Sequence, residues 1–280
     1  MFFINKKASH RLLAQPRNAF SRRIYYNNQP GIDYYNISFL GCQWATAQKI
    51  FFRKDVIIIK HIIDDGFNAE LVSNAFFDGL LEIPIIEKPK EIIIPSELIP
   101  FTQMKRSETK AEAVHFYEHD KRFSDVLTCT KELLAELSEF SAVISPDCSL
   151  YRDMPLCLQI ANTYMNRAVG HYLQSQGVYV IPNIRWGDER SFTTVELPEK
   201  FAFLGAPKNS IVSIGTYGCI QSRENKNYFR KGLSAMLDEL SPEVVLVYGG
   251  MPECIFGEFK DRTRFVNYPD WTSTKRRRAV

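Results

Sequence analysis

The sequence predicts an α/β fold in which crossover helices join a mostly parallel sheet, and three patterns support this prediction. Short runs of valine and isoleucine recur between residues 113 and 247, and unbroken apolar runs are typical of strands covered on both faces. Helical segments lie between most of these runs, as parallel neighbours require. Polar loops follow the runs directly. Five such strands indicate an open sheet or an incomplete (β/α) barrel, because a complete barrel has eight.

The first 80 residues are predicted to form an N-terminal extension with a basic arm. Residues 33–40 and 55–60 have the β-branched and aromatic content of strands. Residues 68–79 have apolar side chains at helical spacing and end on Gly79, which predicts a helix. Prolines 84, 89, 95 and 100 exclude a long helix from the next stretch. Residues 80–101 are therefore predicted to be a linker, or to hold a first strand at 92–94.

Regular alternation begins at residue 113. Strands are predicted at 113–117, 142–144, 178–181, 211–214 and 244–247, and helices at 122–140, 155–176 and 225–240. The helix at 155–176 has the clearest signals, because Pro155 stands at its start and Gly177 at its end. Its apolar stripe comprises Leu156, Ile160, Tyr164, Ala168 and Tyr172. This pattern assigns residues 81–260 to an α/β domain and residues 261–280 to a basic C-terminal tail.

The composition is that of an ordinary soluble protein, with 45% hydrophobic residues, 24% charged residues and a net charge of +3. No apolar run approaches the ~20 residues that cross a bilayer, and the chain start does not read as a secretory signal. We therefore expect a cytoplasmic protein with no membrane partner. Residues 1–32 and 275–278 are basic and contain no acidic residue. Such ends could contact phosphates, although solvated chain ends are the simpler explanation.

The spacing of cysteine and histidine, the residue types that most often bind metals, gives little indication of a metal cofactor. The six cysteines include no Cys-x-x-Cys pair, so reduced and mostly buried thiols are expected. Cys148 and Cys219 are the two that fall in polar loops. The five histidines do not cluster at the spacing of metal ligands. Carboxylates without histidine leave room for Mg²⁺, which prefers oxygen ligands.

Polar residues gather directly after four of the predicted strands, in the loops 145–153, 182–188, 216–218 and 248–253. The carboxyl ends of parallel strands lie along one edge of a sheet, so we expect these loops to converge on one site. The candidate catalytic residues are the carboxylates Asp147, Asp153 and Asp188. The candidate substrate-binding residues are Tyr151, Asn162, Asn183, Arg185, Trp186, Thr216, Gly218 and Gly249.

The acidic candidates each have a structural alternative. Asp147 could act as a general acid or base if burial raises its pKa, or it could close an Asx turn. Asp153 could support the same chemistry, or it could cap the following helix. Arg185 and Trp186 suit a nucleotide, since arginine binds phosphate and tryptophan offers a stacking face. Alternatively, Arg185 pairs with Asp188 while Trp186 covers the core.

Two other groups of candidates are less specific. Gln159, Asn162 and Asn166 share one helix face beside Arg167, and an exposed polar face without a function is the favoured interpretation. Glycines after the last two strands would let the backbone approach a ligand. No phosphate-binding loop, dinucleotide fingerprint or serine nucleophile elbow is present.

Residues 143–155 read Val-Ile-Ser-Pro-Asp-Cys-Ser-Leu-Tyr-Arg-Asp-Met-Pro, and residues 180–188 read Val-Ile-Pro-Asn-Ile-Arg-Trp-Gly-Asp. These segments resemble the bacterial and phage family called domain of unknown function 4417, which usually has phenylalanine in place of Cys148. The resemblance covers about residues 80–256, and its other segments are 83–84, 95–101, 114–117, 159–162, 167–170, 215–219 and 247–250. It implies a family without an established activity, whose members often occur in phages, plasmids and integrated elements.

These observations favour an enzyme, a hydrolase or transferase acting on a nucleotide or nucleic acid. In this hypothesis Asp147 moves a proton, Arg185 binds an anion and Trp186 stacks on a base. The alternative is a non-catalytic accessory protein that binds nucleic acid or a host protein. The sequence discriminates weakly between the two, because the excess basic charge lies mostly at the chain ends.

Overall fold

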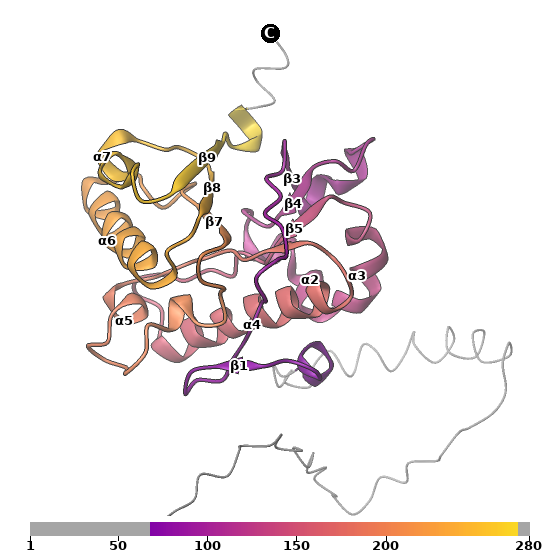
Figure 1. Cartoon of the computed structure of the whole chain (residues 1–280), viewed down its shortest axis with the longest axis horizontal. Helices are drawn as coiled ribbons and strands as arrows, with labels where there is room; N and C mark the ends of the chain where they lie inside the picture. The colour runs from indigo at the N-terminus through magenta and orange to yellow at the C-terminus, as the bar shows by residue number, and fades with distance from the viewer. Residues whose placement is uncertain (1–67, 274–280) are drawn as a thin grey trace, which may run out of the picture. The chain divides into compact units, whose positions relative to one another are not determined.

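The structure is a computed structural model that describes residues 68–273 (Figure 1). The strands predicted at 33–40 and 55–60 and the basic ends of the chain lie outside the described residues. Within them, the prediction of an α/β fold with parallel strands is confirmed. No helix among residues 68–273 combines the length and the apolar character that a membrane span requires.

In the described residues, seven parallel strands follow one another in chain order. Four form one sheet: β3 (Leu98–Pro100), β4 (Ala113–His115), β5 (Ala142–Ile144) and β6 (Val180–Ile181). Three form another: β7 (Ile211–Gly215), β8 (Val244–Tyr248) and β9 (Arg264–Tyr268). Two backbone hydrogen bonds join the two sheets. Ile184 N donates to Ser213 O at 2.8 Å, and Ser213 N donates to Pro182 O at 2.8 Å. The order from β3 to β9 is therefore continuous.

The strands curl toward an incomplete barrel. The rings of His115 on β4 and Tyr248 on β8 have centroids 4.3 Å apart, although four strand spacings would separate them by about 19 Å in a flat sheet. The hydroxyl of Tyr268 on β9 donates to the carbonyl of Pro95, just before β3. The inner side chains of β4 to β9 form one buried cluster, against which Ile92 and Ile94 pack. Figure 1 shows β3–β5 and β7–β9 on opposite sides, with α4 below both groups.

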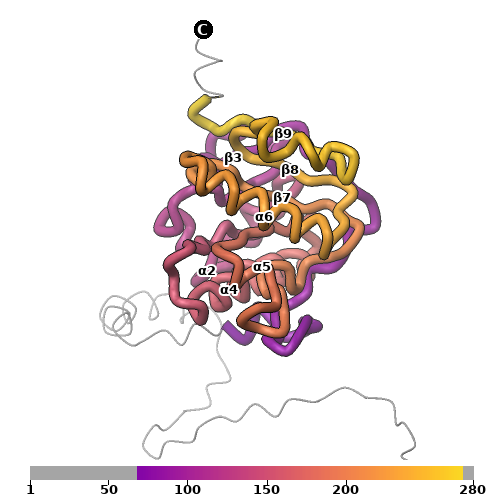
Figure 2. Tube along the Cα trace, turned by 90° about the vertical axis from the view of Figure 1, so that its left-hand side faces the viewer, coloured from indigo at the N-terminus to yellow at the C-terminus, as the bar shows by residue number. Residues whose placement is uncertain are grey.

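Helices cover the outside of the curl in two groups. Against β3–β6 lie α2 (Ser124–Thr128), α3 (Thr130–Leu137) and α4 (Leu156–Ser175). Against β7 and β8 lie α6 (Arg223–Leu240) and α7 (Glu253–Phe256), and α5 (Glu189–Phe192) follows β6. Figure 2 views α6 from outside. As predicted, this helix buries Phe229, Leu233, Met236, Leu237 and Leu240. Short 3-10 helices complete the domain: η1 (Ala69–Val72), η2 (Phe101–Arg106), η3 (Asp120–Arg122), η4 (Phe201–Phe203) and η5 (Gly257–Phe259).

The first described segment corrects two predictions. The helix predicted at 68–79 is wrong: only η1 is helical, and β1 (Phe77–Asp78) pairs with the antiparallel strand β2 (Ile83–Pro84). Gly79 has a positive φ of +67° and turns this hairpin. Of the two alternatives for residues 80–101, a linker or a first strand at 92–94, the strand is wrong, because residues 92–94 have no regular structure. Their isoleucines pack against the interior of the curl without joining a ladder.

Two further differences concern a helix that is interrupted and a strand that was not predicted. The helix predicted at 122–140 is interrupted twice. Phe123, at φ −123° and ψ 17°, separates η3 from α2, and Cys129, at φ −130° and ψ 39°, separates α2 from α3. The strand β9 was not predicted. Its residues are exposed or half-buried except for the buried Tyr268. This suits a strand at the edge of a sheet, where one side has no neighbouring strand.

His115 lies fully buried inside the curl, where its ring contacts those of Tyr117 and Tyr248, which stack on each other. The backbone N–H of Tyr117 donates to His115 Nδ1 at 3.1 Å, which places the proton of the neutral ring on Nε2. Burial lowers the pKa of His115 to about 3. The folded protein therefore binds no proton at this ring at pH values where the unfolded chain does.

We expect His115→Asn to weaken the acid sensitivity of the protein, because the asparagine Oδ1 still accepts from Tyr117 but does not titrate. As the pH falls from the unfolded pKa of 6.5 toward the folded pKa of about 3, the free energy of unfolding of the wild type is expected to decrease by roughly 1.4 kcal/mol more per pH unit than that of the variant. Urea unfolding between pH 7 and pH 4 measures this difference. An identical pH dependence in both proteins would contradict the burial of a neutral imidazole.

Candidate functional site

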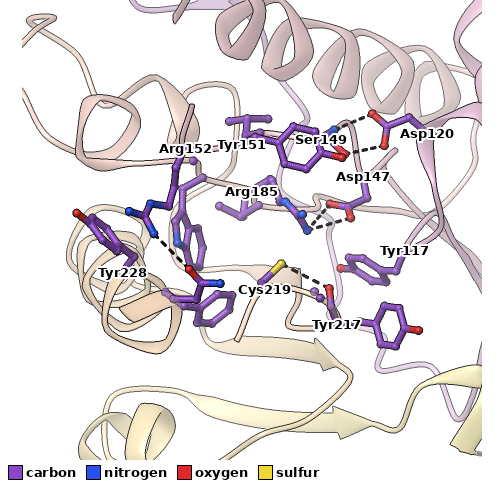
Figure 3. A pocket seen from close by; sticks show the side chains of 18 of the residues that line it. Tyr117, Asp120, Asp147, Ser149, Tyr151, Arg152, Arg185, Tyr217, Cys219 and Tyr228 are labelled. Carbon is purple, nitrogen blue, oxygen red and sulfur yellow. Dashed lines mark hydrogen bonds and ion pairs between the residues drawn. The ribbon is translucent and has the colours of Figure 1, made fainter. Parts of the chain in front are cut away.

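A cavity of about 520 Å³ opens at the carboxyl ends of β4 to β7 (Figure 3). We call it the strand-end cavity. Its walls are residues 117–120 after β4, 147 and 149–153 after β5, 184–187 after β6, 215 and 217–219 at the end of β7, and 225, 228 and 229 in α6. Small-molecule sites have volumes of roughly 300–1,000 Å³ and favour this edge of parallel sheets. The cavity therefore has the size and the position of a ligand site.

Asp147 lies at the base of the strand-end cavity and is 7% exposed. Asn183 Nδ2 donates to its Oδ1 at 2.8 Å, and Arg185 Nη1 donates to its Oδ2 at 3.1 Å. Burial raises the pKa of the Asp147 carboxyl, while the charge of Arg185 and the hydrogen bond from Asn183 act in the opposite direction. Figure 3 shows the guanidinium of Arg185 directed at the carboxylate of Asp147, with dashed lines marking their contacts. The carboxyl is thus oriented by two donors and remains open to a ligand.

A buried hydrogen-bond network fixes this orientation from below. The hydroxyl of Tyr117 donates to Asn183 Oδ1 at 3.0 Å and lies 2.6 Å from Ser213 Oγ. Asn183 Oδ1 is therefore an acceptor, and its Nδ2 must face Asp147. Burial and the charge of Asp147 raise the pKa of Tyr117 well above its usual value. Gly215 leaves room for this ring, because a Cβ there would lie 2.6 Å from it.

The polar face of α4 lies against this network and is buried. Arg167 Nη1 donates to the carbonyl of Asn183 at 2.8 Å and also to Asn166 Oδ1. Ser145 Oγ donates to Asn166 Oδ1 at 3.0 Å. The favoured interpretation of this face as exposed is therefore wrong for Gln159, Asn166 and Arg167, which are fully or nearly fully buried. Its polar groups supply donors to carbonyls at the ends of β5 and β6, where no neighbouring strand provides them.

Aromatic side chains and a second arginine form the outer wall of the cavity. Tyr151 and Tyr217 are 53% and 62% exposed. The guanidinium of Arg152 lies 3.9 Å from the ring centroid of Tyr228 and donates to Glu224 at 2.8 Å. The ring centroid of Trp186 lies 5.0 Å from that of Phe229. Trp186 thus packs in the core and also lines the cavity. These rings offer stacking surfaces for a planar ligand.

Six of the predicted site residues line the strand-end cavity: Asp147, Tyr151, Asp153, Arg185, Trp186 and Gly218. Arg185 pairs with Asp147 and not with Asp188. Asp153 does not cap α4, since Pro155 occupies the N-cap position without a side-chain hydrogen bond. The convergence of strand-end loops predicted from the sequence is therefore present for these residues.

The other predicted residues do not line the cavity. Asn183 lies behind Asp147. Asp188 caps α5 and pairs with Arg190 at 2.7 Å. Asn162 donates to the carbonyl of Ser149 at 2.6 Å. Thr216 Oγ1 donates to the carbonyl of Gly250 at 2.7 Å, and Gly249 packs against it with a positive φ of +105°. These contacts shape the walls of the cavity from outside.

The segment directly after β4 also contributes to the site, although it was not among the predicted site residues. Asp120 lines the cavity, and its carboxylate accepts from Ser149 N at 3.1 Å and from Ser149 Oγ at 2.7 Å. Tyr117 and His119 line the cavity as well. The signal was available, because polar residues follow this predicted strand as they follow the others.

No group of three or more histidine, cysteine, aspartate or glutamate side chains within residues 68–273 is arranged to hold a metal ion. Asp147 already accepts from Asn183 and Arg185, and Asp120 accepts from Ser149. The structure thus offers Mg²⁺ no ready set of carboxylate ligands in the described part of the chain, and a magnesium cofactor stays a hypothesis from the sequence.

Comparison with known families supports the resemblance seen in the sequence. The family described as Domain of unknown function (DUF4417) matches residues 75–269. The chain belongs to this family. It is similar to the "Gene 1 protein" of Mycobacterium phage L5, with 30% identity over 199 residues, which cover 70% of this chain and 82% of that protein. It is also 33% identical over 164 residues to the "Gene 1 protein" of Mycobacterium phage D29 and spans 58% of the length of that relative. No solved structure matches the chain.

Proposed function

We propose that this protein is an enzyme, a hydrolase or transferase, that acts on a nucleotide or on one nucleotide unit of a nucleic acid. The observation that supports this proposal is the position of Asp147, a buried carboxyl with a raised pKa at the base of an aromatic-walled cavity. Buried carboxyls with shifted pKa values in a cleft are typical of general acids and bases. The similarity to phage proteins is consistent with a nucleic-acid context, although it is an association and not a mechanism.

The walls of the strand-end cavity suit the parts of a nucleotide. Tyr151 and Tyr217 are exposed enough to stack on a base. Arg152 stands at the rim, where its guanidinium could reach a phosphate. Arg185 is held by the buried Asp147, whereas Arg152 pairs with the exposed Glu224. A phosphate can displace an exposed carboxylate more readily than a buried one, so we assign the contact with the anion to Arg152 and the orientation of Asp147 to Arg185.

The proton chemistry is assigned to two carboxyls in different environments. Asp147 is buried and is held by Asn183 and Arg185. Asp120 stands on another wall and accepts two hydrogen bonds from Ser149. Burial favours the neutral form of a carboxyl, and the pKa of Asp147 is raised by its burial. In this proposal Asp147 supplies or accepts the proton at the reacting bond, and Asp120 offers the substrate a further acceptor group on the wall of the cavity.

The proposal is tested by a thermal-shift screen of the full chain against nucleobases, nucleosides, nucleoside 5′-phosphates and matched sugar phosphates. A nucleotide at 100 times its Kd is expected to raise Tm by roughly 5–10 °C. Bound ligand should also slow alkylation of Cys219, which lines the cavity, but not of the exposed Cys254. If no compound with a base raises Tm, or if protection of Cys219 is absent, the proposal is rejected.

A further inference from the structure

Two hollows adjoin the strand-end cavity, and we call the three together the trough. A second hollow shares Arg152, Asp153 and Tyr228 with it and continues to Arg190. A third hollow shares Tyr117, Glu118, His119 and Tyr217 with it and continues to Arg122 and Trp271. Because each outer hollow has walls in common with the cavity, a ligand larger than one nucleotide can occupy adjacent hollows.

Each of the three hollows is lined by an aromatic ring and an arginine. The second hollow has Tyr228 and Arg190, and the third has Trp271 and Arg122. A nucleic acid strand repeats one base and one phosphate per unit, and aromatic rings with basic groups along a groove are the usual way of binding single strands. A duplex keeps its base faces stacked inside, so it cannot use rings such as Tyr217.

From this repetition we propose that the substrate is a single-stranded nucleic acid of at least three nucleotides, with the reacting unit in the strand-end cavity. This inference rests on the proposed function and narrows its substrate. The outer arginines already form ion pairs, Arg122 with Glu118 at 3.7 Å and Arg190 with Asp188 at 2.7 Å. Phosphates must compete with these carboxylates, so recognition depends more on stacking than on net charge. With at most three phosphate contacts, log K is expected to fall with log salt with a slope no steeper than about −2.

The experiment is a competition assay on the full chain with random-sequence DNA and RNA of one, two, three and six nucleotides. The affinity is expected to rise about ten-fold per nucleotide up to three and little thereafter. Trp271→Ala and Arg122→Ala should each reduce binding of the trinucleotide toward that of the dinucleotide and leave mononucleotide binding unchanged. Arg122→Ala is the safer variant for folding, since its side chain is 65% exposed.

Matched controls are Phe76→Ala, an exposed aromatic residue outside the trough, and Arg230→Ala, an exposed arginine in an ion pair outside it. Neither should change the dependence on length. Equal affinity for one and six nucleotides would overturn this inference and leave the proposed function intact. Binding of no nucleotide of any length would reject both. Binding of a neutral oligosaccharide such as maltohexaose without any oligonucleotide would also overturn the inference, because sugar chains stack on aromatic rings without phosphates.

Discussion

Replacement of Asp147 by asparagine is expected to lower kcat on the nucleotide substrate by about 10²–10⁴-fold, the usual contribution of a positioned general acid or base. The amide has the shape of the carboxyl and can still accept from Asn183, but it cannot exchange a proton at neutral pH. Binding should change less, because the aromatic walls are untouched. The measurement is the steady-state rate with the ligand that the thermal-shift screen identifies.

The matched control is Asp238→Asn. Asp238 also pairs with an arginine, Arg262, at 2.7 Å, but it lies on α6 away from the strand-end cavity. Its replacement should leave kcat unchanged. A folded Asp147→Asn variant with full activity would contradict a catalytic role. If folded Asp147→Asn and Arg185→Ala variants both kept the full biological activity of the protein, the non-catalytic alternative, an accessory protein that binds nucleic acid or a host protein, would be favoured.

The position of the candidate site could be predicted from sequence because it depends on one general rule. Unbroken valine and isoleucine runs indicate covered strands, intervening helices make them parallel, and parallel strands end at one edge. This rule was enough to predict that Asp147 and Arg185 lie at one site, although they are 38 positions apart in the sequence. It did not identify which acid pairs with which arginine, since pairing depends on the direction of each side chain and not on the order of the strands.

The burial of α4 could not be predicted in the same way. Its apolar stripe suggests that the opposite, polar face meets solvent, yet Gln159, Asn166 and Arg167 point inward. A helix that crosses the ends of strands meets unpaired backbone carbonyls there, and these require donors. Only the position of the helix relative to β5 and β6 reveals this requirement, and hydrophobic periodicity carries no information about it.

Arg167 provides the test of this interpretation with the largest expected effect on stability. It is 1% exposed, and its guanidinium donates to the carbonyls of Leu204 at 3.0 Å, Asn183 at 2.8 Å and Ala202 at 3.1 Å. Burial lowers the pKa of Arg167 to about 10, so it stays charged at neutral pH. We expect Arg167→Met to reduce the free energy of unfolding by about 3–5 kcal/mol, because it leaves three buried carbonyls without this donor. Urea denaturation at pH 7 measures the change.

A control variant distinguishes the loss of these buried hydrogen bonds from the loss of an arginine charge. Arg230 has a similar side chain on α6, but it is about half exposed and pairs with Glu258 at the surface, so Arg230→Met should cost less than about 1 kcal/mol. Equal losses in the two variants would show that Arg167 is not a buried donor. A large loss for Arg167→Met alone would show that the buried guanidinium stabilises the domain through these carbonyls. One of them belongs to Asn183, whose side chain donates to Asp147, so the candidate catalytic group is held by the same hydrogen-bond network.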